Sequence, residues 1–209
     1  MKWMKIIILL LTFFVVNNSS SQNLKEGDLL FQHLSCGDFC DAIEKVTPAY
    51  QNTHFSHVAI VVKKNQNQWL VAEAINKGVS LTDLDTFIAR SGKENIYVGR
   101  VKNNYFIPKI IDIEPYIGKP YDTVFDISNK AYYCSELVYF LYKDKKKGHP
   151  IFKLNPMTFK DPETNDYFPA WVEYFNKMNV PIPENKPGLN PGSMINQTEI
   201  YEKIFPLRK

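Results

Sequence analysis

The most informative segment of this chain is YYCSELVYFLY at residues 132–142. From Cys134 to Tyr142 the side chains are apolar almost all round, as expected of a helix buried in a core. Cys134 opens that helix, where the first N–H groups are unpaired and the helix dipole is positive. This position lowers the pKa of a thiol, and the same N–H groups suit an oxyanion. The alternative is a buried structural cysteine, and position alone leaves both roles open.

An antiparallel hairpin is expected upstream of this helix, with strands at residues 55–62 and 69–74 around a polar turn. Its register places His57 and Glu73 opposite each other, or within one residue of that. A carboxylate there would fix the imidazole tautomer and leave the other ring nitrogen free to act. Taken singly, the two are more simply a satisfied core histidine and a solvent-facing glutamate, but their pairing favours function.

The other elements mix strands and helices without the strict alternation of a doubly wound sheet, which favours an α+β fold. The chain shows no internal repeat. We expect a turn feeding a short strand within 24–32, a strand at 95–101, helices within 37–50, 109–117 and 170–178, a solvated helix end at 143–147, and an irregular surface arm at 179–193.

Composition excludes several classes of protein. With 14% aromatic residues and 25 Lys and Arg against 22 Asp and Glu, the chain is neither disordered nor strongly charged. A formal charge of +3 gives no argument for a nucleic-acid partner. The length of 209 residues suits one domain.

The amino terminus reads as a secretory signal peptide at residues 1–21, followed by a single domain at 22–209. Two lysines precede an apolar run at 6–16, and small residues follow. The alternative is an uncleaved anchor, but eleven apolar residues fall short of the roughly 20 that span a bilayer. We therefore expect a secreted or periplasmic protein, in which Cys36 and Cys40 form a disulfide or stay as free thiols.

Four motifs occur in an order that suggests a family: GDLLFQ at 27–32, SHVAIV at 56–61, GKPYD at 118–122 and YCSELV at 133–138. The chain resembles the YiiX/YaeF-like, circularly permuted papain-like proteins of the NlpC/P60 superfamily. Ordinary members place the cysteine helix before the histidine strand, whereas here the histidine comes first, as in the permuted branch. The resemblance runs from about residue 27 to residue 142.

This resemblance implies a small antiparallel sheet or half-barrel packed on the helix that carries Cys134. It implies that Cys134 is the nucleophile, His57 the general base and then acid, and Glu73 the polar third member. Tyr121 matches a substrate-site tyrosine of the unpermuted relatives. Tyr133 stands where the unpermuted peptidoglycan hydrolases carry an Asp that helps to bind a substrate amine.

Two further candidates come from the residues alone. Gln32, on the strand after the Gly-Asp turn, is either an oxyanion donor or a sheet-edge amide. His54 and His57 form an H-x-x-H pattern, but residues three apart on a strand point to opposite faces, so we expect no metal site.

The interpretation is an extracytoplasmic thiol hydrolase that cleaves an amide bond through a thioester, without a cofactor. The expected substrate is a peptide, cell-wall or acyl-amide compound, with possible association with a membrane surface or the cell wall. One alternative is a lipid amide or ester hydrolase or acyltransferase, which the resemblance implies because other permuted relatives act on acyl groups. The aromatic residues at 132–142 and 167–175 either wall an apolar groove for a lipid or acyl chain or, more simply, pack the core. Another alternative is a non-catalytic binding module on the same fold.

Overall fold

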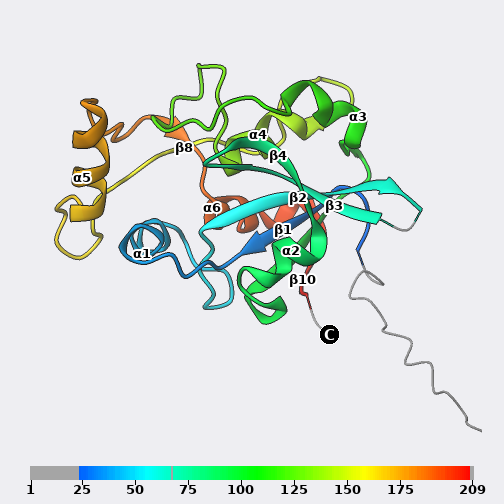
Figure 1. Ribbon diagram of the computed structural model, residues 1–209, viewed down its shortest axis with the longest axis horizontal. Coiled ribbons are helices and arrows are strands. Elements are labelled where there is room, and N and C mark those ends of the chain that lie inside the picture. The colour runs from blue at the N-terminus through cyan, green and yellow to red at the C-terminus, as the bar shows by residue number, and fades with distance from the viewer. Residues whose placement is uncertain (1–23, 67, 208–209) are drawn as a thin grey trace, which may run out of the picture.

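The computed structural model of the protein describes residues 24–66 and 68–207 (Figure 1), so the expected signal peptide at 1–21 lies outside the described residues. A six-stranded antiparallel sheet forms its centre, in the order β10-β5-β1-β2-β3-β4. The strands are β1 (Asp28–Gln32), β2 (His57–Asn65), β3 (Gln68–Ile75), β4 (Gly78–Asp83), β5 (Ile96–Val101) and β10 (Tyr201–Pro206).

Six α-helices surround this sheet in the described part of the chain: α1 (Asp38–Lys45), α2 (Leu84–Ala89), α3 (Ile110–Ile113), α4 (Cys134–Leu141), α5 (Pro169–Met178) and α6 (Pro191–Ile195). Two small ladders pair β6 (Tyr105–Phe106) with β7 (Lys143–Asp144), and β8 (Asn155–Pro156) with β9 (Pro187–Gly188). None of the helices among the described residues has the length and apolar character needed to cross a membrane.

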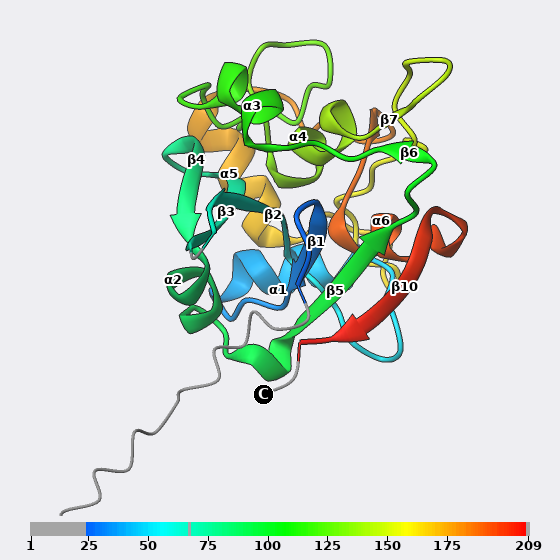
Figure 2. The same ribbon diagram turned by 90° about the vertical axis from the view of Figure 1, so that its right-hand side faces the viewer.

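The central strands are apolar on both faces because helices cover both faces. In β2, Val58 and Ile60 belong to the same core cluster as Leu137 of α4, and Val61 belongs to a second cluster with Phe87 of α2. Alternate residues of a strand point to opposite faces, so β2 reads as a continuous apolar run. Figure 2 shows α4 and α2 on either side of the strands β2 and β3.

A third cluster lies beyond the sheet, where α1 and α5 pack together at one end of the molecule (Figure 1). Its centre is aromatic: the ring centroids of Phe39 and Trp171 are 4.6 Å apart, and those of Phe159 and Trp171 are 5.0 Å apart. The aromatic segment at 167–175 therefore packs against α1, a segment far away in the sequence.

The expected hairpin, the strand at 95–101 and the helices at 37–50, at Cys134 and at 170–178 are all present. The helix at 109–117 is shorter than expected: α3 gives way to a 3-10 turn at Glu114–Tyr116, where Pro115 cannot continue the α-helical bonding. The structure adds β4, α2 and β10, which the sequence patterns did not indicate.

Two expectations were wrong. Residues 143–147 are not a helix end, because α4 stops at Leu141 and Asp144 instead closes a turn by accepting the N–H groups of Lys146 and Lys147. The arm at 179–193 is only partly a surface segment, since Leu189 is 4% exposed and packs in the main core. Its proline and glycine content marked irregular backbone, which is a separate property from exposure.

The neighbouring interior strands β1 and β5 are joined by a buried ion pair. Asp28 lies directly opposite Arg100, whose Nε and Nη2 donate to the two carboxylate oxygens at 2.8 and 2.6 Å. Both residues are less than 9% exposed, so each charge depends on the other for compensation.

We expect Arg100→Met to lower the free energy of unfolding by about 3–5 kcal/mol, because the Asp28 carboxylate stays buried without its guanidinium. Urea unfolding measures this loss. The double variant with Asp28→Asn should recover part of it, since the stranded charge is then gone. A loss below about 1 kcal/mol in Arg100→Met would contradict a compensating role for this pair.

Candidate active site

The free cysteine of the described chain opens α4. The chain enters this helix in extended conformation at Tyr133, and Tyr132 donates its N–H to the carbonyl of Pro120 at 3.0 Å. The apolar residues that follow Cys134 bury the helix against β2. This packing leaves the thiol 8% exposed at the positive end of an eight-residue helix.

His57 is the first residue of β2 and is 6% exposed. Its Nε2 lies 2.8 Å from Oε2 of Glu73, which leaves Nδ1 as the ring nitrogen that can interact with Cys134. Burial by itself would lower the pKa of His57, but the hydrogen bonds and charges of Cys134 and Glu73 raise that pKa to about 9. The imidazole is therefore held in its protonated form at neutral pH.

The thiol of Cys134 shows the matching shift. Burial raises the pKa of Cys134, but the hydrogen bond and positive charge of His57, with a further bond from the backbone of Val58, lower it below its ordinary value. The hydroxyl of Ser135 is 3.8 Å from the sulfur. A thiolate beside an imidazolium is the arrangement that activates a sulfur nucleophile.

Glu73 anchors the pair from β3, where it has no solvent exposure. Arg90 donates to both of its oxygens at 2.7 Å, and Thr82 donates to Oε1 at 2.5 Å. Burial raises the pKa of Glu73, but the bonds from His57, Arg90 and Thr82 outweigh it and lower that pKa to about 2. The carboxylate is therefore charged over the whole ordinary pH range.

The hairpin brings His57 and Glu73 together in a different register from the expected one. Ile60 pairs with Ala72, so Glu73 lies opposite Ala59, two residues along β2 from His57. An irregularity in the pairing between Lys63 and Asn65 shifts the turn. The long side chain of Glu73 spans the diagonal to the ring, within the reach of cross-strand neighbours.

Arg90 and Thr82 are the site residues that sequence reasoning missed. Thr82 lies on β4 and Arg90 directly follows α2. Neither element was anticipated, and no spacing along the chain relates either residue to Glu73. The one available signal was Glu73 itself, because a carboxylate in an apolar strand needs partners from elsewhere.

The three expected substrate-site residues differ in position. Tyr121 and Tyr133 line a cavity together with Cys134, and burial together with the charge of Cys134 raises the pKa of Tyr121 well above its ordinary value. The hydroxyl of Tyr133 accepts the N–H of Leu189 at 3.1 Å.

Gln32 is not among the described residues that line this cavity, and its Nε2 donates to the carbonyl of Phe87 and to Ser91, both at 2.9 Å. Its amide therefore has no hydrogen left for an oxyanion.

The cavity has a volume of about 80 Å³. Its walls come from α1, from the segments on either side of α4, from α5 and from the start of α6. They comprise Ile43, Val46, Thr47, Ser56, Tyr121, Phe125, Tyr133, Cys134, Ser135, Met157, Thr158, Phe159, Trp171, Leu189, Asn190 and Pro191.

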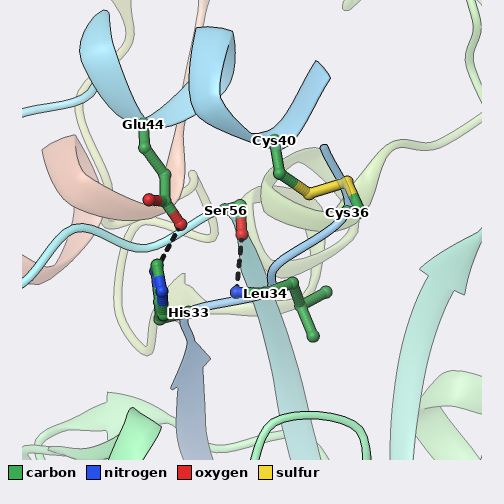
Figure 3. Close-up of a disulfide and its surroundings, with 6 residues drawn as sticks. All are labelled: His33, Leu34, Cys36, Cys40, Glu44 and Ser56. Atoms are coloured by element: carbon green, nitrogen blue, oxygen red, sulfur yellow. Dashed lines mark hydrogen bonds and ion pairs between the residues drawn. A yellow bond between two sulfur atoms is a disulfide. The ribbon is translucent and has the colours of Figure 1, made fainter. Parts of the chain in front are cut away.

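A disulfide between Cys36 and Cys40 ties the loop after β1 to α1, the helix that forms one wall of the cavity (Figure 3). The same loop is bonded to the strand that carries His57, because Leu34 donates its N–H to Ser56 at 3.0 Å. His33 lies 2.6 Å from Glu44 of α1. These three links fix α1 beside the site.

His54 does not join His57 in a metal site. Its Nδ1 donates to the backbone carbonyls of Glu44 and Thr47 at 2.9 and 3.1 Å. Within residues 24–66 and 68–207, no group of three or more His, Cys, Asp or Glu side chains is placed to hold a metal ion.

A second buried acid lies on α4. Glu136 has no solvent exposure, and its Oε2 accepts the N–H of Tyr133 at 3.2 Å. Its Oε1 has no partner among the described residues. Burial, together with the nearby charges of Asp122 and Asp126, raises the pKa of Glu136 to about 8. The side chain is therefore mainly protonated at neutral pH.

Glu73→Gln should lower the pKa of His57 from about 9, because Cys134 alone then opposes the effect of burial. An NMR titration of the ring protons measures this change. Thr82→Val is the matched control, since it removes one donor to Glu73 but keeps the charge beside His57. If His57 titrated alike in Glu73→Gln and the native chain, the carboxylate would not be what holds its proton.

Glu136 should make the fold less stable as pH rises from about 4.5 to about 8, because only the unfolded chain loses this proton freely. Urea unfolding of the native chain and Glu136→Gln at pH 5 and pH 9 tests this. The native chain should lose a few kcal/mol relative to the variant at pH 9. Equal pH dependence of the two proteins would show that the carboxyl ionises freely in the fold.

Three comparisons place the chain among known proteins. A family model described as permuted papain-like amidase enzyme, YaeF/YiiX, C92 family, matches residues 23–202. The uncharacterized protein YiiX of Escherichia coli is 32% identical over 122 residues, an alignment that spans 56% of this chain and 57% of the relative. A crystal structure titled metalloprotein YiiX, from Escherichia coli O157:H7, has a TM-score of 0.63 at 23% identity and covers 88% of this chain and 97% of that one. The chain belongs to the permuted papain-like amidase family YaeF/YiiX.

Proposed function

We propose that this chain hydrolyses an amide bond with Cys134 as nucleophile, His57 as proton carrier and Glu73 as the group that orients His57. One observation carries the proposal: the His57 ring lies 2.8 Å from a buried, charged carboxylate, and its interaction with Cys134 raises the pKa of the imidazole and lowers the pKa of the thiol. The order nucleophile, base and orienting acid is the arrangement that acyl transfer requires.

The reaction follows from these positions. The Cys134 thiolate attacks the amide carbonyl carbon, forming a C–S bond, while the first N–H groups of α4 stabilise the oxyanion. His57 gives its proton to the amine as the C–N bond breaks, which leaves a thioester. His57 then takes a proton from water, the resulting hydroxide attacks the thioester, and the C–S bond breaks to release the acid and restore the thiolate with protonated His57.

The proposed site of action lies outside the cytosol, on cell-wall or other peptide amides near the cell wall or membrane surface. Two observations support this location: the Cys36–Cys40 disulfide, which persists in oxidising compartments, and the signal-peptide pattern at 1–21. The amide-hydrolase class supports a peptide or amide substrate.

Iodoacetamide labelling tests the activated pair, because Cys134 is the single cysteine outside the disulfide. We expect labelling at neutral pH with an apparent pKa below that of an ordinary thiol. His57→Ala should slow it at least about tenfold at pH 7 and move the profile to higher pH, since burial then raises the thiol pKa unopposed. Intact-protein mass spectrometry follows the modification.

His149→Ala is the matched control, because this exposed histidine lies outside the site. Its labelling should equal that of the native chain. Labelling that is indifferent to His57→Ala would rule out the activated pair. An activated thiol that forms no thioester and releases no product from muropeptides or N-acyl amides would instead favour a binding module.

A further inference from the structure

Apart from the Cys134 sulfur itself, the cavity beside Cys134 has no charged lining. None of its described lining residues is Asp, Glu, Lys, Arg or His, although 22% of the whole chain is Asp, Glu, Lys or Arg. Of the site residues that carry charge, Cys134 lines the cavity, whereas His57, Glu73 and Arg90 are not among the lining residues. Beyond the reacting sulfur, a ligand group entering this space therefore meets apolar, aromatic and neutral polar side chains.

The walls are built from packed aromatic rings that hold one another in place. Phe125 lies 5.3 Å from Tyr133 and 5.8 Å from Trp171, and Phe159 lies 5.0 Å from Trp171, between ring centroids. Trp171 and Phe159 are 3% and 4% exposed. Rings at these separations attract one another, so the cavity is formed before a ligand arrives.

The size of the cavity limits what fits. By the same measure of volume, a cavity needs roughly 10–15 Å³ to hold one water molecule. The cavity of about 80 Å³ therefore holds about five to eight groups of that size. A short alkyl or aromatic group fits, and a long lipid chain does not fit within it.

We propose that this cavity binds the acyl part of the substrate, as an uncharged apolar or aromatic group of about five to eight non-hydrogen atoms. The proposal rests on the proposed function, in which the acyl group stays bonded to the Cys134 sulfur as a thioester while the amine departs. Cys134 is itself a wall of the cavity, so the group that remains on the sulfur is the one the cavity adjoins.

The lining also makes the cavity selective against charged substrate groups. A carboxylate in this space would lose its hydration without gaining a cationic partner, which is strongly unfavourable. The acidic groups of a stem peptide therefore have to lie outside the cavity, and selectivity for an apolar acyl group comes from Met157, Phe159 and Trp171.

Ligand binding to Cys134→Ser tests this without any chemistry. Hexanamide and adipic acid monoamide have the same length and differ by a terminal carboxylate. NMR titration should give hexanamide at least about tenfold tighter binding than the monoamide, because only the monoamide carries a charge into the cavity. Affinity should rise from propanamide to hexanamide and should not rise further with decanamide.

Met157→Lys in the Cys134→Ser background adds a cation to the wall at a half-buried residue. It should reduce the preference at least about tenfold or invert it, whereas Met157→Leu, which keeps the volume, should leave it unchanged. Equal binding of the two ligands, a preference for the carboxylate, a preference that Met157→Lys does not change, or a further rise with decanamide overturns the proposal.

A parallel measurement separates this proposal from the proposed function. The native chain is mixed with p-nitrophenyl hexanoate or with the p-nitrophenyl monoester of adipic acid, and mass spectrometry follows the acyl group on Cys134. Faster acylation by the hexanoate supports the acyl assignment, and equal rates overturn it. If neither ester acylates Cys134 in a His57-dependent way while hexanamide still binds preferentially, the mechanism fails and the apolar cavity stands.

Discussion

A carboxylate with no solvent exposure lies on β3, between β2 and the edge strand β4, and the geometry of the site depends on keeping it charged. Glu73 receives two bonds from Arg90, one from Thr82 and one from His57. Each donor comes from a different element, so the charge joins β2, β3, β4 and the end of α2 around one point. A buried charge is tolerated only with such a complete set of partners. The same bonds fix the orientation of the His57 ring toward Cys134.

Burial has opposite consequences for the two acids near the site. Glu73 has cationic and hydroxyl donors, and its pKa falls to about 2. Glu136 has one backbone donor and acidic neighbours, and its pKa rises to about 8. The hydrogen-bonding and charged partners of each carboxyl, rather than its degree of burial, therefore decide its charge. Glu73 stays ionised, and Glu136 is a neutral group within the helix that carries Cys134.

Much of the fold can be predicted from the pattern of apolar and polar residues along single elements. The apolar run after Cys134, the apolar strands of the hairpin and the strand at 96–101 each follow from the pattern of side chains along one element. The expectations for 143–147 and 179–193 were wrong because the same residue pattern is compatible with two different structures. The charged run after α4 closes a turn rather than a helix, and the proline-rich segment before α6 folds inward to form a wall of the cavity.

Cys134 at a helix start, and His57 and Glu73 on one hairpin, follow from the amino-acid order, because these relations span one element or one turn. The meeting of Cys134 with His57, 77 positions apart, follows from the packing of α4 on β2. Three features exist only in the folded chain. They are the contacts of Arg90 and Thr82 with Glu73, the hydrogen bonds that the Gln32 amide donates within the protein, and the cavity whose lining beyond Cys134 is uncharged. Contacts of that kind depend on the path of the whole backbone, and residue spacing does not encode that path.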